Sequence, residues 1–115
     1  MLNIILYKKG IYYNKLEASG HAGFAEKGSD IVCAGASSLL QTMLIGLKEH
    51  CKKSVIRCND DNLSWNLSNS DNKQIKKADF IITLFMKGIE EIRKLYPGYI
   101  KIKIKRERYK QTAVL

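Results

Sequence analysis

The sequence lacks the cysteine patterns that build disulfide frameworks and common zinc sites. Its 115 residues contain three cysteines, Cys33, Cys51 and Cys58, and none of them belongs to a CxxC pair. Cys51 and Cys58, even together with His50, do not have the spacing of a common zinc site. An odd number of unpaired cysteines favours reduced thiols. We therefore expect no disulfide, no metal and no cofactor.

Long apolar runs and an export signal are also missing. The apolar run from Leu2 to Leu6 is short and has no basic segment before it, unlike a secretory signal peptide. No stretch of the sequence approaches the ~18 consecutive apolar residues that a membrane span needs. These two absences predict a cytoplasmic protein with no membrane partner.

Acidic side chains are few, because 11 Asp and Glu oppose 20 Lys and Arg and leave a net charge of +9. Near the C-terminus only Glu107 opposes a cluster of basic residues, Lys101, Lys103, Lys105, Arg106, Arg108 and Lys110. Such a cluster attracts RNA or a ribosomal surface, or it is a solvated strand face whose lysines prevent edge-to-edge aggregation. The second interpretation is favoured, because no aromatic base-stacking motif accompanies the charge.

The hydrophobic share of 45% is typical of a globular chain, and 115 residues can bury roughly two-thirds of the unfolded surface. Alternating apolar residues predict strands over 2–7, 11–18, 54–58, 63–68 and 100–104. Apolar steps of three and four predict helices over about 30–50 and 71–96, with Asp30 and Asp71 as N-caps and Gln74 completing a capping box. No linker or low-complexity segment divides residues 1–115, so we expect a single domain.

The predicted order of elements is β-β-α-β-β-α-β. A mixed, largely antiparallel sheet with two helices packed against one face would bury the apolar side of each predicted strand and helix. The expected fold is therefore an α+β two-layer sandwich.

One segment that contains several glycines carries both a histidine and a cysteine, with His21 before Cys33. Cys33 falls in the first turn of the predicted helix, where unpaired N–H groups and the helix dipole lower a thiol pKa. A Cys/His pair is suited to acyl transfer. The backbone N–H groups of Cys33 and Ala34 are candidates for an oxyanion hole.

Alternative interpretations stay open for each of these residues. Asp30 either orients His21 or only caps the helix, and the two roles can coexist. Ser37 lies one turn after Cys33 and either supports the thiol or is an ordinary small helix residue. From spacing alone, Cys33 is more often an inert structural thiol.

The run Gly20-His21-Ala22-Gly23, followed by Gly28, Asp30-Ile31-Val32-Cys33-Ala34 and Ser37, resembles the signature of the ribosomal-processing cysteine proteases called Prp or YsxB-like. The likeness in predicted elements extends over essentially the whole chain. It implies an endopeptidase with Cys33 as the nucleophile and His21 as the base.

The resemblance also implies a substrate and a binding loop. Family members remove a short N-terminal extension from large-subunit ribosomal protein L twenty-seven, after a hydrophobic segment, during ribosome assembly. The implied substrate loop includes Gly20, Gly23, Phe24 and Gly28, with Phe24 expected to line an apolar groove. Family members are described as homodimers, which this sequence neither supports nor opposes. The alternative function is a non-catalytic module that binds RNA or the ribosome through the basic C-terminal strand.

Overall fold

Five strands and two helices follow one another in the predicted order. The computed structural model describes residues 1–26, 28–67 and 71–107. Within them the elements are β1 (Leu2–Lys9), β2 (Tyr12–Ser19), α1 (Ile31–His50), β3 (Val55–Cys58), β4 (Asn62–Asn66), α2 (Asn72–Leu95) and β5 (Ile100–Glu107).

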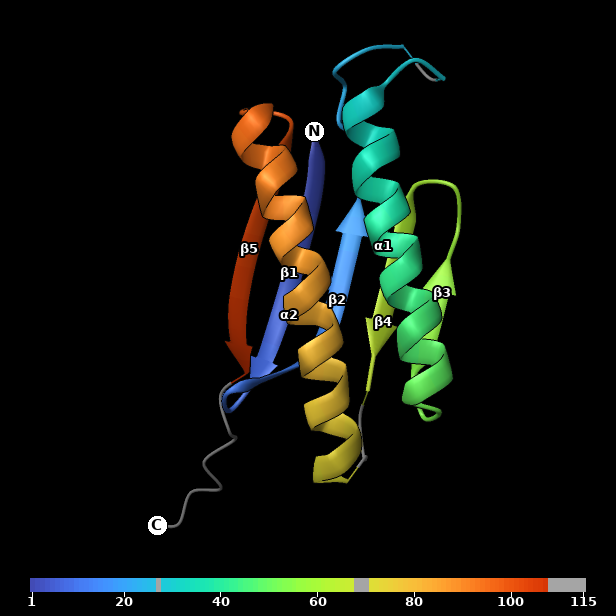
Figure 1. Cartoon of the computed structure of the whole chain (residues 1–115), viewed down its shortest axis with the longest axis vertical. Coiled ribbons are helices and arrows are strands. Elements are labelled where there is room, and N and C mark those ends of the chain that lie inside the picture. The colour runs from blue at the N-terminus through green and yellow to red at the C-terminus, as the bar shows by residue number, and fades with distance from the viewer. Residues whose placement is uncertain (27, 68–70, 108–115) are drawn as a thin grey trace.

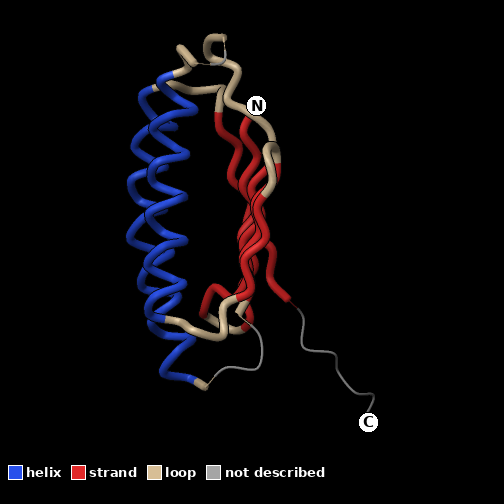
Figure 2. The backbone as a smooth tube through the Cα atoms, turned by 90° about the vertical axis from the view of Figure 1, so that its right-hand side faces the viewer, coloured by secondary structure: helices blue, strands red, loops and turns tan. Residues whose placement is uncertain are grey.

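The strands form one sheet in the order β3-β4-β2-β1-β5. β1 and β5 are parallel and every other neighbouring pair is antiparallel. Both helices lie on the same side of the sheet and run antiparallel to each other (Figures 1 and 2). The predicted α+β two-layer fold is therefore confirmed.

The predicted caps begin both helices. Asp30 caps α1 by accepting a hydrogen bond from the Cys33 N–H, and Asp71 caps α2 by accepting one from the Gln74 N–H. The reciprocal half of the capping box is absent from the described residues, because the Gln74 side-chain oxygen is buried without a hydrogen-bond partner. The second helix therefore begins with a single capping hydrogen bond.

The apolar stripes of the two helices pack against the sheet as predicted. On α1 the buried residues are Val32, Ala36, Leu40, Met43, Leu44 and Leu47. On α2 they are Ala78, Ile82, Met86 and Ile89, whereas the predicted Phe85 and Ile92 are only partly buried at the margin of the core. Trp65 of β4 is fully buried and donates from Nε1 to the Ser54 hydroxyl at 2.8 Å.

Several strand predictions need correction, among them the fourth strand, which spans Asn62–Asn66 instead of 63–68, with residue 68 outside the described residues. The second strand begins at Tyr12 instead of Ile11, because Ile11 belongs to the hairpin turn and is 69% exposed. The apolar face predicted for the last strand is fully buried only at its beginning, since Ile100 is buried but Ile104 is 51% exposed. Figure 1 shows the reason: α2 lies over the beginning of β5 and diverges from its end.

The expectation that no segment is long and apolar enough to span a membrane is also wrong. The 20 residues of α1 reach a mean hydropathy of 1.4 over their most apolar window and pass that test of length and composition. Core helices pass the same test, and the apolar stripe of α1 packs against the sheet. The buried stripe of α1 accounts for part of its hydropathy.

Three segments meet at one end of the sandwich: the loop after β2, the first turn of α1 and the turn between β3 and β4 (Figure 1). The Gly20 N–H donates to the Asp61 carbonyl at 3.1 Å and joins the loop to that turn. Gly20 has a φ of +83°, and a Cβ there would lie 2.6 Å from the Met1 carbonyl oxygen. Only glycine fits this close approach.

The capping contact of α2 can be tested through stability. We expect Asp71→Ala to lower the free energy of unfolding by about 1 kcal/mol, because the Gln74 N–H loses its acceptor. Asp71→Asn keeps an acceptor at the same place and should stay near the wild-type value. Urea unfolding of the three proteins measures both changes. Equal stability of the Ala and Asn variants would contradict this role.

Candidate active site

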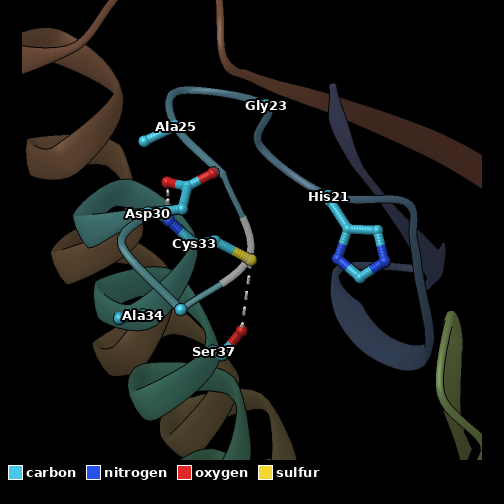
Figure 3. Close-up of a pocket in the computed structure, with 8 residues that line it drawn as sticks. His21, Gly23, Ala25, Asp30, Cys33, Ala34 and Ser37 are labelled. Atoms are coloured by element: carbon cyan, nitrogen blue, oxygen red, sulfur yellow. Dashed lines mark hydrogen bonds between the residues drawn. The ribbon is translucent and has the colours of Figure 1, made fainter.

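The thiol of Cys33 and the imidazole of His21 lie opposite each other at this end of the fold. Cys33 is partly buried in the first turn of α1, and His21 is exposed on the loop that follows β2. In Figure 3 the loop arches from His21 through Gly23 and Ala25 back to Asp30. The structure thus brings the two predicted reactive residues to one site.

Asp30 holds the loop and the helix together. One carboxylate oxygen accepts from the Cys33 N–H at 2.9 Å, and the other accepts from the Phe24 N–H at 3.1 Å. The Cys33 N–H, together with the N–H groups of Phe24, Ala25 and Gly23, holds the pKa of the Asp30 carboxyl below its usual value. The capping interpretation of Asp30 is therefore confirmed.

The predicted oxyanion hole needs correction. The Cys33 N–H donates to the Asp30 side chain and the Ala34 N–H donates to the Asp30 carbonyl, each at 2.9 Å. Both donors are occupied, because an N-cap residue accepts from the N–H groups of the first turn. A different backbone donor, the N–H of Ala22, interacts with the Cys33 thiol.

The site stabilises the charged forms of both reactive residues. Burial raises the pKa of the Cys33 thiol, but the Ala22 N–H, His21 and Ser37 outweigh it, so the pKa lies below its usual value. The Cys33 side chain, followed by Asp61, raises the pKa of His21 above its usual value. A thiolate facing an imidazolium is the combination that these opposite shifts favour.

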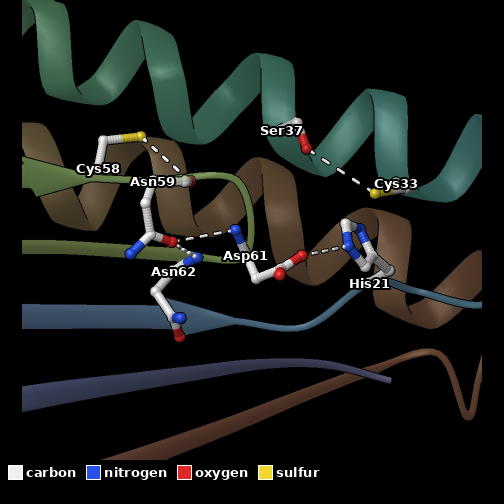
Figure 4. A network of polar contacts seen from close by, with 7 residues as sticks. All are labelled: His21, Cys33, Ser37, Cys58, Asn59, Asp61 and Asn62. Carbon is white, nitrogen blue, oxygen red and sulfur yellow. Dashed lines mark hydrogen bonds and ion pairs between the residues drawn. The ribbon is translucent and has the colours of Figure 1, made fainter.

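The carboxylate that contacts His21 is Asp61, which sequence reasoning missed. His21 Nε2 lies 2.9 Å from Asp61 Oδ1 (Figure 4). The Asn59 side-chain oxygen accepts from the N–H groups of both Asp61 and Asn62, which fixes the turn that carries the carboxylate. Asp30, for which orienting His21 was one of two open interpretations, accepts from backbone N–H groups of the loop and α1.

Ser37 is directed toward the thiol, as its position one turn after Cys33 predicts. Its hydroxyl oxygen lies 3.9 Å from the Cys33 sulfur (Figures 3 and 4). The interaction lowers the thiol pKa, so the hydroxyl favours the thiolate.

Two adjoining hollows meet at Cys33, His21 and Ser37. The first lies under the loop and is lined mainly by small residues, among them Gly23, Ala25, Gly28 and Ala34. The second extends along the end of β2 toward the β3–β4 turn, and Gly20 and Asp61 are among the residues that line it. Together they make a depression on both sides of the thiol.

Phe24 does not line the hollow under the loop, which corrects the expectation for this residue. Its ring packs edge-on against Tyr96 and Tyr99, with ring centroids 5.2 Å apart in each pair. Edge-to-face aromatic pairs are stabilising. Phe24 therefore fastens the loop to the end of α2 and the segment before β5.

Neither of the other two cysteines has the environment of Cys33, although Cys58 is among the residues that line the second hollow. Cys51 is fully buried in the core, and burial raises the pKa of its thiol. Cys58 is exposed at the end of β3. Within residues 1–26, 28–67 and 71–107 no group of three or more His, Cys, Asp or Glu side chains could hold a metal ion.

Residues 1–101 match the sequence model of the family described as cysteine protease Prp. This chain belongs to the Prp family. The ribosomal processing cysteine protease Prp of Mycoplasma pneumoniae is 51% identical to it over 35 residues, which make up 30% of this chain and 35% of that protein. The alignment therefore spans about a third of the curated relative's length.

Crystal structures of other proteins share the Prp fold of this chain. The essential ribosomal processing protease Prp from S. aureus, in complex with a covalently linked product peptide, matches with a TM-score of 0.81 and 22% identity over 91% of this chain and 100% of that one. SMU.848 from Streptococcus mutans matches with a TM-score of 0.76 and 24% identity over 93% and 96%. These likenesses show that the arrangement of the sheet and helices is shared.

The contact between Asp61 and His21 predicts a measurable pKa change. In Asp61→Asn the pKa of His21 should fall toward its usual value, because the imidazolium loses a negative partner. Titration of the His21 ring by NMR measures the change. Asp60→Asn is the matched control, since it removes a neighbouring carboxylate that does not contact His21. An unchanged His21 titration in Asp61→Asn would show that the contact is absent in solution.

Proposed function

We propose that this chain is a cysteine endopeptidase in which Cys33 is the nucleophile and His21 the general acid and base. The observation that carries the proposal is the pairing of a thiol of lowered pKa with an imidazole of raised pKa, on two residues within the range 1–101 that matches the Prp family model. The S. aureus relative with its covalently linked product peptide supports the same chemistry.

The mechanism begins with attack of the Cys33 thiolate on the scissile carbonyl carbon. His21 as imidazolium donates its proton to the leaving amine, and the acyl-enzyme forms as the C–N bond breaks. Neutral His21 then removes a proton from water, which attacks the acyl carbon, and the Cys33 thiolate leaves. Asp61 holds the imidazole in place through both steps as a positioning residue.

The developing oxyanion needs a hydrogen-bond donor that becomes free when the thiolate attacks. The N–H groups of Cys33 and Ala34 serve Asp30. We assign the role to the Ala22 N–H, which already interacts with the sulfur atom beside which the oxyanion forms. Ser37 supports the thiolate in the same proposal.

The proposed substrate is the N-terminal extension of large-subunit ribosomal protein L twenty-seven, removed in the cytoplasm during ribosome assembly by a protease domain that spans residues 1–115. The small residues Gly23, Ala25, Gly28 and Ala34 leave room under the loop for a bulky apolar residue of the extension. The names of the M. pneumoniae and S. aureus relatives support a role in ribosomal processing. The homodimer implied by the family resemblance stays a prediction.

Cleavage of a synthetic peptide that spans the extension tests the proposal. Cys33→Ala should abolish cleavage, and His21→Ala should lower kcat/KM by about 10²- to 10⁴-fold, the usual contribution of a general acid and base. Mass spectrometry of the products measures both effects.

The matched control is His50→Ala, which removes the other histidine, an exposed residue at the end of α1. It should cleave at the wild-type rate. Wild-type cleavage by the Cys33→Ala protein would refute the proposed nucleophile. Equal rates in the His21→Ala and wild-type proteins would refute the proposed acid and base.

A further inference from the structure

The sheet has one face that no described helix covers. Both helices lie on the other side, and neither of them lies on the side of the sheet turned away from them (Figure 2). Side chains alternate between the two faces of the sheet along each strand. Leu2, Ile4 and Leu6 of β1 are buried in the core. The residues that alternate with them, and the partners of those residues on neighbouring strands, point to the open face. The open face is a separate surface from the layer between sheet and helices.

Strand register places residues of the open face in rows, three of which precede the register shift between Tyr7 and Lys8, and the Cα pair Lys9–Glu107 follows them. Each row contains Cα partners from neighbouring strands, and such partners point to the same side of the sheet. The first row is Lys101, Asn3, Ser19 and Asn62. The second is Lys103, Ile5, Glu17, Ser64 and Arg57. The third is Lys105, Tyr7, Lys15, Asn66 and Val55.

These rows concentrate positive charge around a tyrosine. Five of their members are basic: Lys15, Arg57, Lys101, Lys103 and Lys105. Glu17 is the single acid in the three rows, and its carboxylate lies 3.2 Å from the Lys15 ammonium. The ammonium groups of Lys15 and Lys105 lie 4.8 and 5.9 Å from the centre of the Tyr7 ring. Most of the other members of the three rows are Asn and Ser, which offer hydrogen bonds.

The side chains of the open face favour a polyanion as the binding partner. A second copy of this chain would bring one basic face against another, and a basic protein would be repelled in the same way. An anionic membrane is a poor fit, because Ile5 and Val55 are the only aliphatic side chains in the three rows. Successive phosphates of a nucleic-acid strand match the three lysines along β5, and the partly exposed ring of Tyr7 beside them offers a base a surface for stacking.

We propose that the open face of the sheet binds RNA, with Lys101, Lys103 and Lys105 contacting its phosphates. The proposed site combines the lysines of β5 with residues of the other four strands. It does not include Arg108 and Lys110, which lie outside the described residues. Cys33 and His21 are on the helix side and at one end of the fold, so bound RNA leaves them accessible. The inference is independent of the proposed protease activity.

Fluorescence anisotropy with a labelled 20-nucleotide oligouridine and with a fragment of ribosomal RNA tests the proposal. The variant Lys101→Gln/Lys103→Gln/Lys105→Gln should bind at least about 10-fold more weakly at moderate salt. The slope of log K against log salt should become shallower by about 2, because each lost phosphate contact removes about 0.7 from the slope. The matched control Lys48→Gln/Lys73→Gln/Lys87→Gln removes equal charge from exposed positions of the two helices. It should bind almost as well as the wild type.

A second variant acts in the opposite direction. Glu17→Gln removes the single acid of the three rows and should tighten binding by a few-fold, a gain that a folding defect cannot produce. Equal losses in the two triple variants would overturn the proposal in favour of unspecific attraction by net charge. Binding of phosphatidylserine vesicles without binding of either RNA would overturn it in favour of a membrane. Peptide cleavage by the β5 triple variant, measured in parallel, reports on the protease separately.

Discussion

Two hydrogen bonds to the Asp30 carboxylate fix the geometry on which the rest of the site depends. The Cys33 N–H is held by one oxygen and the Phe24 N–H by the other, at 2.9 and 3.1 Å. The first bond starts α1 at the residue that puts Cys33 in its opening turn. The second draws the loop back over the helix, so the loop that carries His21 closes toward the thiol. One side chain thereby positions both reactive groups.

The fold supports this loop geometry at two further points. Near the middle of the loop, Phe24 packs against Tyr96 and Tyr99. At the near end, Gly20 bonds to the Asp61 carbonyl, and the side chain of Asp61 meets His21. The apolar stripe of α1 anchors the helix in the core, so its first turn is a rigid base for the thiol. Precise geometry here comes from packing that lies outside the reacting atoms.

Local features of this molecule could be predicted from the sequence, and contacts between distant segments could not. Asp30 was identifiable as a cap because a capping residue and its helix are adjacent in the chain, and the helical stripes follow from a spacing of three and four residues. Asp61 was missed because its contact with His21 requires the β3–β4 turn to return beside the end of β2. Its only sequence signal is the polar turn Asn59-Asp60-Asp61-Asn62, which marks a turn but no partner. The exposure of Ile104 depends on how α2 crosses the sheet, which periodicity does not encode.

The central claim is that His21 and the surrounding donors hold Cys33 in its thiolate form. The most direct measurement is the rate at which iodoacetamide alkylates Cys33 as a function of pH, followed by mass spectrometry of the peptide that contains it. The midpoint should lie at lower pH than that of cysteine in an unstructured peptide and should move to higher pH in His21→Ala, because the thiolate then loses the imidazole. A midpoint equal to that of the free peptide, or one that His21→Ala leaves unchanged, would contradict the account.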